Sequence, residues 1–92
     1  MDLHQHWAET ERQLRAARAE LPAVPRQEPS LGTDDQYQGY LDANELQLAL
    51  EELEGLGEQN DALPAFWNML RTAAERMGLR EHAARYARRA TP

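Results

Sequence analysis

The sequence lacks cysteine and lysine altogether, and all ten of its positive charges are arginines. Without cysteine the chain can form no disulfide and offers no thiol nucleophile, which fits a reducing compartment. With no isoleucine, one valine and four threonines, it has few of the β-branched side chains that favour strands. It also lacks an apolar run near the ~20 residues of a membrane span, and its N-terminus lacks the apolar stretch of a signal peptide. These absences argue against a sheet and a membrane segment, and we expect a cytoplasmic protein.

What remains is dominated by alanine, leucine, glutamate, arginine and glutamine, which are strong helix formers. A chain of 92 residues is the size of one domain. We therefore predict an all-α fold, a small bundle of four or five helices in a single domain. Its expected parts are an N-terminal helix over 1–21, a proline-rich linker over 22–33 and a helical core over 34–90.

The N-terminal helix carries an apolar stripe with helical spacing. The stripe comprises Leu3, Trp7, Thr10, Leu14, Ala17 and Leu21. It can pack onto the rest of the domain or form a coiled-coil seam between two chains; packing is favoured, because three heptads with a threonine in the seam make a weak zipper. Asp2 is placed to cap this helix, and we expect Trp7, Phe66 and Trp67 to lie in the core.

Capping residues, glycines and prolines predict the other helix boundaries. Thr33 with Gln36 indicates one helix start, and Asp42 with Glu45 resembles a capping box for a second. The two pieces could also form one bent helix over 34–56. Gly55 and Gly57 are expected to end the helix that follows Asp42. We expect the next helix to be capped by Asn60 or Asp61, to carry Pro64 in its first turn and to end at Gly78.

The stretch DDQYQGYLDANEL resembles the calcium loop of an EF-hand. Asp34, Gly39 and Glu45 occupy the first, sixth and twelfth positions of that pattern. However, Gln36 and Gln38 stand where acidic ligands belong, and the proline-rich segment before Asp34 cannot supply the helix that enters such a loop. We therefore interpret the stretch as two helix starts with a bend at Gly39.

Charge is distributed unevenly along the chain. Residues 27–70 contain ten acids and no base, whereas residues 71–92 contain six arginines and two acids. In one interpretation the C-terminal arginines pair with the acidic central helix through partly exposed ion pairs. In the other, the acids form a surface that attracts a basic protein and repels nucleic acid. The residues predicted to contact such a partner are Asp34, Asp35, Tyr37, Tyr40, Glu51, Glu54 and Glu58.

No pattern of catalytic or metal-ligating residues stands out. His4 and His6 are two residues apart and face different directions on a helix, and His82 has no partner at ligand spacing. Ser30 is the only serine and lies in the linker. We predict no enzyme activity, no metal and no cofactor, and the pI near 4.9 argues against nucleic acid as a partner.

Two neighbouring segments show a recognisable pattern. In YLDANELQLALEELEGLGEQND, a Leu-Asp-x-Asn-Glu start precedes a Leu/Ala-rich helix. In FWNMLRTAAERMGL, the next helix opens on Phe-Trp and closes on Met-x-Leu. This pattern resembles small acidic helical immunity proteins encoded beside bacterial polymorphic toxins, including the Maf-type immunity family. The matching residues are Leu41, Asp42, Asn44, Glu45, Leu48, Ala49, Phe66, Trp67, Ala74, Met77 and Leu79. The resemblance covers about residues 37–79 and implies an inhibitor that blocks a toxin by binding it.

We therefore predict a non-enzymatic protein-binding module, immunity- or antitoxin-like, that binds a basic toxin through an acidic helical surface. Charge reversal at Glu51, Glu54 and Glu58 is then expected to weaken capture of the partner without unfolding the domain. The alternative is a homodimeric helical scaffold or adaptor, joined through the N-terminal helix, with no toxin partner.

Overall fold

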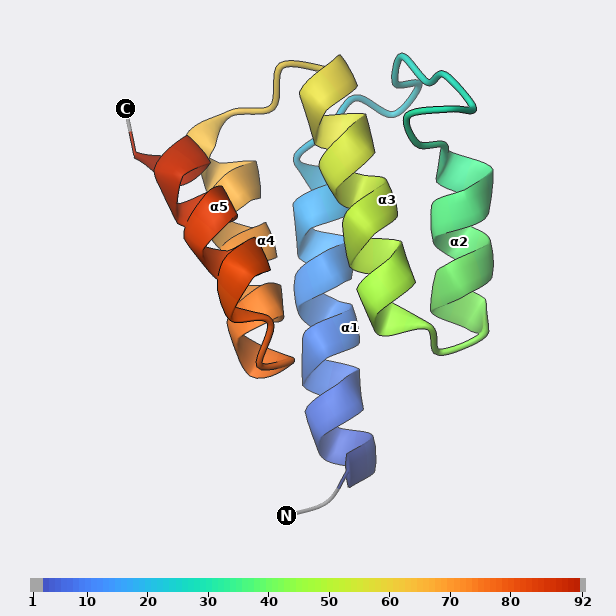
Figure 1. The fold of residues 1–92 in the computed structure, drawn as a ribbon. Coiled ribbons are helices and arrows are strands. Elements are labelled where there is room, and N and C mark those ends of the chain that lie inside the picture. Colours follow the sequence, from blue (N-terminus) through green and yellow to red (C-terminus); the bar gives the residue numbers. More distant parts are fainter. Residues whose placement is uncertain (1–2, 92) are drawn as a thin grey trace.

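The computed structural model describes residues 3–91, and within them the chain folds into five helices. They are α1 Leu3–Ala19, α2 Asp34–Asp42, α3 Leu46–Gln59, α4 Pro64–Arg76 and α5 Arg80–Ala90. Helix α1 lies between α3 and α4, α2 lies on the far side of α3, and α5 lies in front of α4 in this view (Figure 1). Side chains of α5 also reach α3. The predicted all-α bundle is confirmed. The expected cap at Asp2 lies outside the described residues.

All five helices contribute side chains to one core. The buried apolar residues are Leu14, Ala17, Leu21, Tyr37, Leu41, Leu46, Ala49, Leu50, Leu53, Leu56, Phe66, Trp67, Leu70, Ala73, Ala74, Ala83 and Tyr86. Thr10 is also fully buried, and its hydroxyl donates to the carbonyl of His6 at 3.1 Å, so its polar group is satisfied within α1. The α1 stripe therefore packs inside the domain from Thr10 onward, and a coiled-coil seam through the same residues would compete with the core.

Trp7 departs from the expected pattern. Phe66 and Trp67 are buried as predicted, but Trp7 keeps 39% of its surface exposed. The expectation that Trp7 is a core residue is therefore wrong. The reason is its position on the first turns of α1, near one end of the bundle, where fewer neighbouring segments are available to cover it (Figure 1).

Several predicted helix signals are confirmed. The Thr33 hydroxyl accepts a hydrogen bond from the Gln36 N–H at 3.2 Å and caps α2. Pro64 is the first residue of α4, where its missing amide hydrogen costs nothing. Gly78 follows α4 with a φ of 72°, a left-handed conformation that suits glycine.

The second half of the DDQYQGYLDANEL stretch folds differently from the prediction. Asp42 is the last residue of α2 rather than the first of a new helix, and the Glu45 side chain makes no capping hydrogen bond to α3. The chain reverses at Asn44, which has a φ of 59°, and α2 and α3 are therefore two separate helices. Gly39 lies within α2 and is not the bend.

Glycines in α3 mark close packing rather than a helix end. The helix continues through Gly55 and Gly57 to Gln59. A Cβ atom on Gly55 would overlap the backbone carbonyl of Leu31, and one on Gly57 would overlap the ring of Phe66. The prediction failed because local propensity cannot reveal that another segment approaches the helix at these points.

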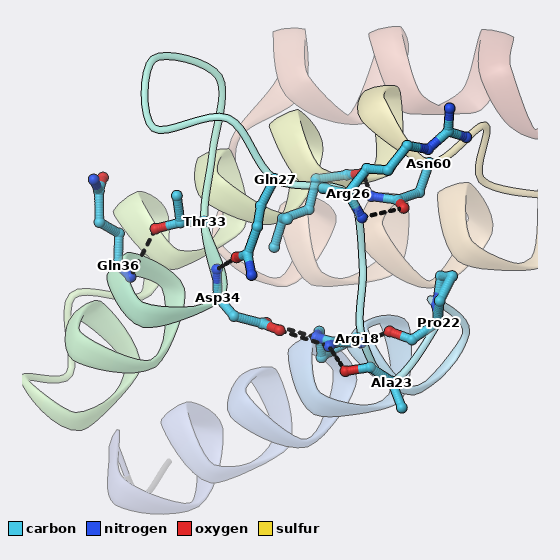
Figure 2. Close-up of polar contacts among 10 residues, drawn as sticks. Arg18, Pro22, Ala23, Arg26, Gln27, Thr33, Asp34, Gln36 and Asn60 are labelled. Atoms are coloured by element: carbon cyan, nitrogen blue, oxygen red, sulfur yellow. Dashed lines mark hydrogen bonds and ion pairs between the residues drawn. The ribbon is translucent and has the colours of Figure 1, made fainter.

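Asn60 and Asp61 also differ from the prediction, because neither caps α4. Asn60 is the C-cap of α3, and Leu63 precedes Pro64 at the start of α4 without a side-chain cap. The Asn60 amide instead holds the proline-rich segment: it accepts from the Arg26 N–H at 2.8 Å and donates to the Arg26 carbonyl at 2.9 Å (Figure 2).

The segment 22–33 is therefore a loop that hydrogen bonds hold against the end of α3. Besides the Asn60 contacts, the Gln59 side chain accepts from the Glu28 N–H at 2.6 Å and donates to the Gly32 carbonyl at 3.0 Å. Prolines remove amide donors from this segment, and side-chain amides at the end of α3 satisfy several of the backbone groups that remain.

Candidate functional site

The acids of α3 that the sequence singled out lie against α5. Glu51 Oε2 is 2.8 Å from His82 Nε2, and Glu58 accepts from Arg89 at 2.6 Å. Between them, Glu54 accepts from Nε and Nη2 of Arg85 at 2.7 and 2.8 Å. We refer to these three pairs as the α3–α5 ladder.

The ladder forms because two parallel helices carry matched spacings. Helices α3 and α5 run in the same direction (Figure 1), and each pair joins residues 31 positions apart. Steps of three and four residues keep the acids on one face of α3 and their partners on one face of α5. Pairing of the C-terminal arginines with the acidic helix, predicted from the charge pattern, is therefore confirmed for Arg85 and Arg89. His82 was missed, although it stands at matching spacing before them.

Glu54 is the most buried acid of the ladder. Its side chain is 20% exposed, compared with 40% for Glu51 and 46% for Glu58. Its Oε1 also accepts a hydrogen bond from the hydroxyl of Tyr86 at 2.7 Å. Burial alone would raise the pKa of Glu54, but the hydrogen bonds from Arg85 and Tyr86 outweigh it, so the pKa lies below its usual value. Glu54 is therefore ionised at neutral pH and links α3 to α5.

Aromatic rings of the core support the ladder from beneath. Tyr86 is fully buried, and burial, together with the hydrogen bond to the Glu54 carboxylate, raises its pKa. The guanidinium of Arg89 lies 4.5 Å from the centroid of the Trp67 ring, within the range of a cation–π contact. The Arg89 guanidinium thus binds Glu58 and also lies over the indole of Trp67.

The ladder changes what the predicted acidic strip can do. Partly exposed ion pairs each contribute less than ~1 kcal/mol to the stability of a fold. Even so, Glu51, Glu54 and Glu58 each already have a partner within the chain. Charge reversal at Glu51, Glu54 and Glu58 would place like charges against α5. A loss of partner capture in that variant could therefore not be separated from a loss of stability.

Asp34, another predicted contact, is also engaged within the chain. Its two carboxylate oxygens each accept from Arg18, both at 2.7 Å, and Figure 2 shows the two side chains meeting end to end. Arg18 further donates to the carbonyl of Pro22 at 3.1 Å. The hydrogen bond to Asp34 is the main reason why the pKa of Arg18 is raised. Asp34 thus fastens the start of α2 to the end of α1.

The two predicted aromatic contacts also face inward. Tyr37 is 4% exposed, and burial raises its pKa. Tyr40 is half-buried and packs against the core. A surface contact through Tyr37 requires exposure that the folded chain does not provide, because Tyr37 fills the space between α2 and the rest of the bundle.

On α2 and the turn after it, three acids are exposed and lack an ion-pair partner among the described residues. Asp35, Asp42 and Glu45 are exposed and form no ion pair with any described residue. We refer to these three residues as the α2 acidic face. Of the predicted contacts it contains only Asp35. The sequence pattern predicted that Asp42 and Glu45 cap a helix, but Asp42 ends α2 and the Glu45 side chain makes no capping hydrogen bond.

Among the described residues, no group of three or more histidine, cysteine, aspartate or glutamate side chains could hold a metal ion. The EF-hand-like stretch is helical from Asp34 to Asp42. No helix in the described part of the chain is long and apolar enough to cross a membrane.

Comparisons with known proteins identify no relative. No protein-family model, curated protein or solved structure gives a significant match to this chain. Function must therefore be inferred from the fold, its charge and its surface.

Proposed function

We propose that the protein is a non-enzymatic protein-binding module, immunity- or antitoxin-like, that captures a basic protein. The supporting observation is the separation of charge in the fold. Helices α2 and α3 and the turn between them contain no base, and the α2 acidic face remains unpaired after the internal ion pairs of the described residues are counted. A surface of one sign attracts a cationic partner and accelerates association.

The position of α2 suits such contact. This helix packs chiefly against α3, and its other side faces outward at the edge of the bundle (Figure 1). Asp35, Gln38 and Asp42 follow one another at helical spacing and are exposed. Gly39 lies among them, and a Cβ atom there would meet nothing within 4 Å. Nothing in the fold requires a glycine at this site, and its lack of a side chain lets a partner's backbone approach the helix closely.

The resemblance to immunity proteins of polymorphic-toxin systems supports a particular class of partner. A toxin that acts on nucleic acid carries positive charge around its active site to attract phosphates. A rigid acidic helix can bind to that charged surface and cover it. In this proposal the protein inhibits the toxin by covering its active-site surface. The α2 acidic face attracts the basic partner and orients it as the two proteins associate.

The test is affinity capture with the tagged chain, using the products of neighbouring reading frames as candidate partners. We expect a basic protein to bind the wild type, and the double variant Asp35→Asn, Asp42→Asn to weaken binding by about tenfold. The matched control is Glu20→Gln with Glu81→Gln. Both acids are exposed, Glu20 directly after α1 and Glu81 in the first turn of α5, and their substitution removes the same amount of charge.

Rising salt should reduce the difference between the wild type and the Asp35, Asp42 variant, because ions screen exposed charges. Capture of no basic protein would contradict the proposal. An equal loss of binding in the Glu20, Glu81 control would show that net charge, and not the α2 acidic face, determines the binding.

A further inference from the structure

Trp7 stands between two adjoining hollows near one end of the bundle. The first has a volume of about 370 Å³ and is lined by His6, Trp7, Asn44, Leu46, Arg76 and Met77. The second, of about 330 Å³, is lined by Trp7, Ala8, Glu11 and Asn44. Trp7 and Asn44 border both hollows, so one indole and one turn residue form a ridge with a depression on either side.

Three separate parts of the chain build these walls. Trp7 comes from α1, Asn44 from the turn between α2 and α3, and Leu46 from the start of α3. Met77 is the C-cap residue that follows α4. Leu46 is 8% exposed, and Met77 packs partly against the core. The first hollow is therefore backed by the apolar core and set by tertiary structure.

The lining of the first hollow contains residue types that are typical of binding hot spots. Tryptophan and arginine are enriched among residues that dominate interface energy, and methionine adapts its shape to different side chains. Trp7 keeps 39% of its surface exposed, whereas Trp67, the other tryptophan of the chain, keeps 2%. An indole at a partly covered position still has apolar area to bury against a partner.

Charge around the hollows indicates the chemistry of the occupant. Glu45 lies between two lining residues in the chain, and Glu75 precedes the lining residue Arg76. Both glutamates are exposed and form no ion pair with described residues. Arg76 is itself 3.7 Å from Glu9, a carboxylate that partly balances its charge. Glu45 and Glu75 therefore place negative charge without an ion-pair partner among the described residues next to lining residues of the first hollow, whose floor is apolar.

We infer that the Trp7 hollows bind an amphipathic segment of a basic protein, one that places large apolar side chains in the hollows and arginine or lysine against Glu45 and Glu75. This inference rests on the proposed function, because the occupant belongs to the same basic partner. The α2 acidic face steers that partner, and the Trp7 hollows anchor it. Asp42 and Glu45 lie directly before and after the Ala43–Asn44 turn, so the two surfaces are continuous.

The inference can be tested with synthetic peptides and two-dimensional NMR of the full chain. The probe is a helical leucine/arginine peptide, compared with a serine/arginine peptide of equal charge and a leucine/glutamate peptide of equal apolarity. The indole N–H signal of Trp7 is identified by its loss in Trp7→Phe. We expect the leucine/arginine peptide to shift the Trp7 indole and the Asn44 side-chain amide, and to leave the Trp67 indole in place.

Variants separate the anchor from the steering surface. Trp7→Ala should weaken the leucine/arginine peptide at least tenfold, whereas Leu63→Ala, which removes an apolar side chain that is 72% exposed elsewhere, should leave its affinity unchanged. Circular dichroism of both variants establishes that they are folded. An unmoved Trp7 indole, or equal shifts with the serine/arginine or leucine/glutamate peptide, would overturn the inference. If affinity falls in the Asp35, Asp42 variant but not in Trp7→Ala, the proposed function survives and the anchor fails.

Discussion

The α3–α5 ladder predicts that Glu54→Ala destabilises the domain far more than Glu58→Ala does. Both glutamates accept hydrogen bonds from an arginine of α5, and on the α3 sequence they look equivalent. Only Glu54 also accepts from a fully buried group, the hydroxyl of Tyr86. The comparison therefore isolates the contribution of that buried hydroxyl from that of an exposed ion pair.

The magnitude follows from the surroundings of each partner. Removing Glu54 leaves the Tyr86 hydroxyl without its acceptor in the core, which costs about 1–3 kcal/mol. The lost pair with Arg85 adds at most ~1 kcal/mol, because the Arg85 side chain is 42% exposed and water screens it. The sum is about 1–4 kcal/mol, or a fall in Tm of roughly 5–30 °C for a domain of this size. Glu58→Ala should cost less than ~1 kcal/mol.

The assay is urea unfolding at neutral pH, followed by far-ultraviolet circular dichroism, for the two single variants and for Glu54→Ala combined with Tyr86→Phe. Without the hydroxyl, the loss of Glu54 leaves no unsatisfied buried donor, so its cost should fall by about 1–2 kcal/mol in the Tyr86→Phe background. Equal losses for Glu54→Ala and Glu58→Ala, or a Glu54 cost unaffected by Tyr86→Phe, would refute the reasoning.

Three further predictions concern packing and pH. Gly55→Ala should destabilise the domain by about 1–3 kcal/mol in urea unfolding, because the new methyl group would overlap the Leu31 carbonyl; Gly39→Ala, at an open helical position, should stabilise it by about 0.5–1 kcal/mol. Because folding lowers the pKa of Glu54, the ionised carboxylate contributes fully to the free energy of unfolding above the unfolded pKa of about 4.3. This contribution is lost as pH falls through the folded pKa. Thermal unfolding of Glu54→Gln should therefore vary less with pH than that of the wild type below about pH 5. Because folding raises the pKa of Tyr86, the protonated hydroxyl contributes fully to the free energy of unfolding below about pH 10, and this contribution is lost as pH rises toward the folded pKa. Tyr86→Phe should therefore reduce the fall in Tm at alkaline pH. An unchanged alkaline profile of Tm would contradict this.

Local sequence signals predicted the elements whose causes are themselves local. The helix-forming composition required an all-α fold, and the Thr33 cap, the Pro64 start and the Gly78 end depend on one residue's own backbone or on a neighbour a turn away. The ion pairs of α5 with α3 were also foreseeable, because an acidic helix and an arginine-rich helix in one small bundle attract each other.

Errors arose where a distant segment decides the outcome. Gly55 and Gly57 look like helix terminators, yet they are the points where the loop at Leu31 and the ring of Phe66 approach α3. Asn60 looks like a helix cap, yet it holds the backbone of Arg26, 34 positions away. In each case a tertiary contact outweighs a local preference of about 1 kcal/mol.

By itself, the sequence determined the fold class, the approximate helices and the separation of charge, because each follows from composition and spacing. The tertiary structure alone decided which acids remain available. It paired Asp34, Glu54 and Glu58 with arginines and Glu51 with a histidine of other helices, buried Tyr37, and left Asp35, Asp42 and Glu45 on the surface. Exposure and pairing depend on which helices pack together, and one-dimensional spacing shows only which residues share a face.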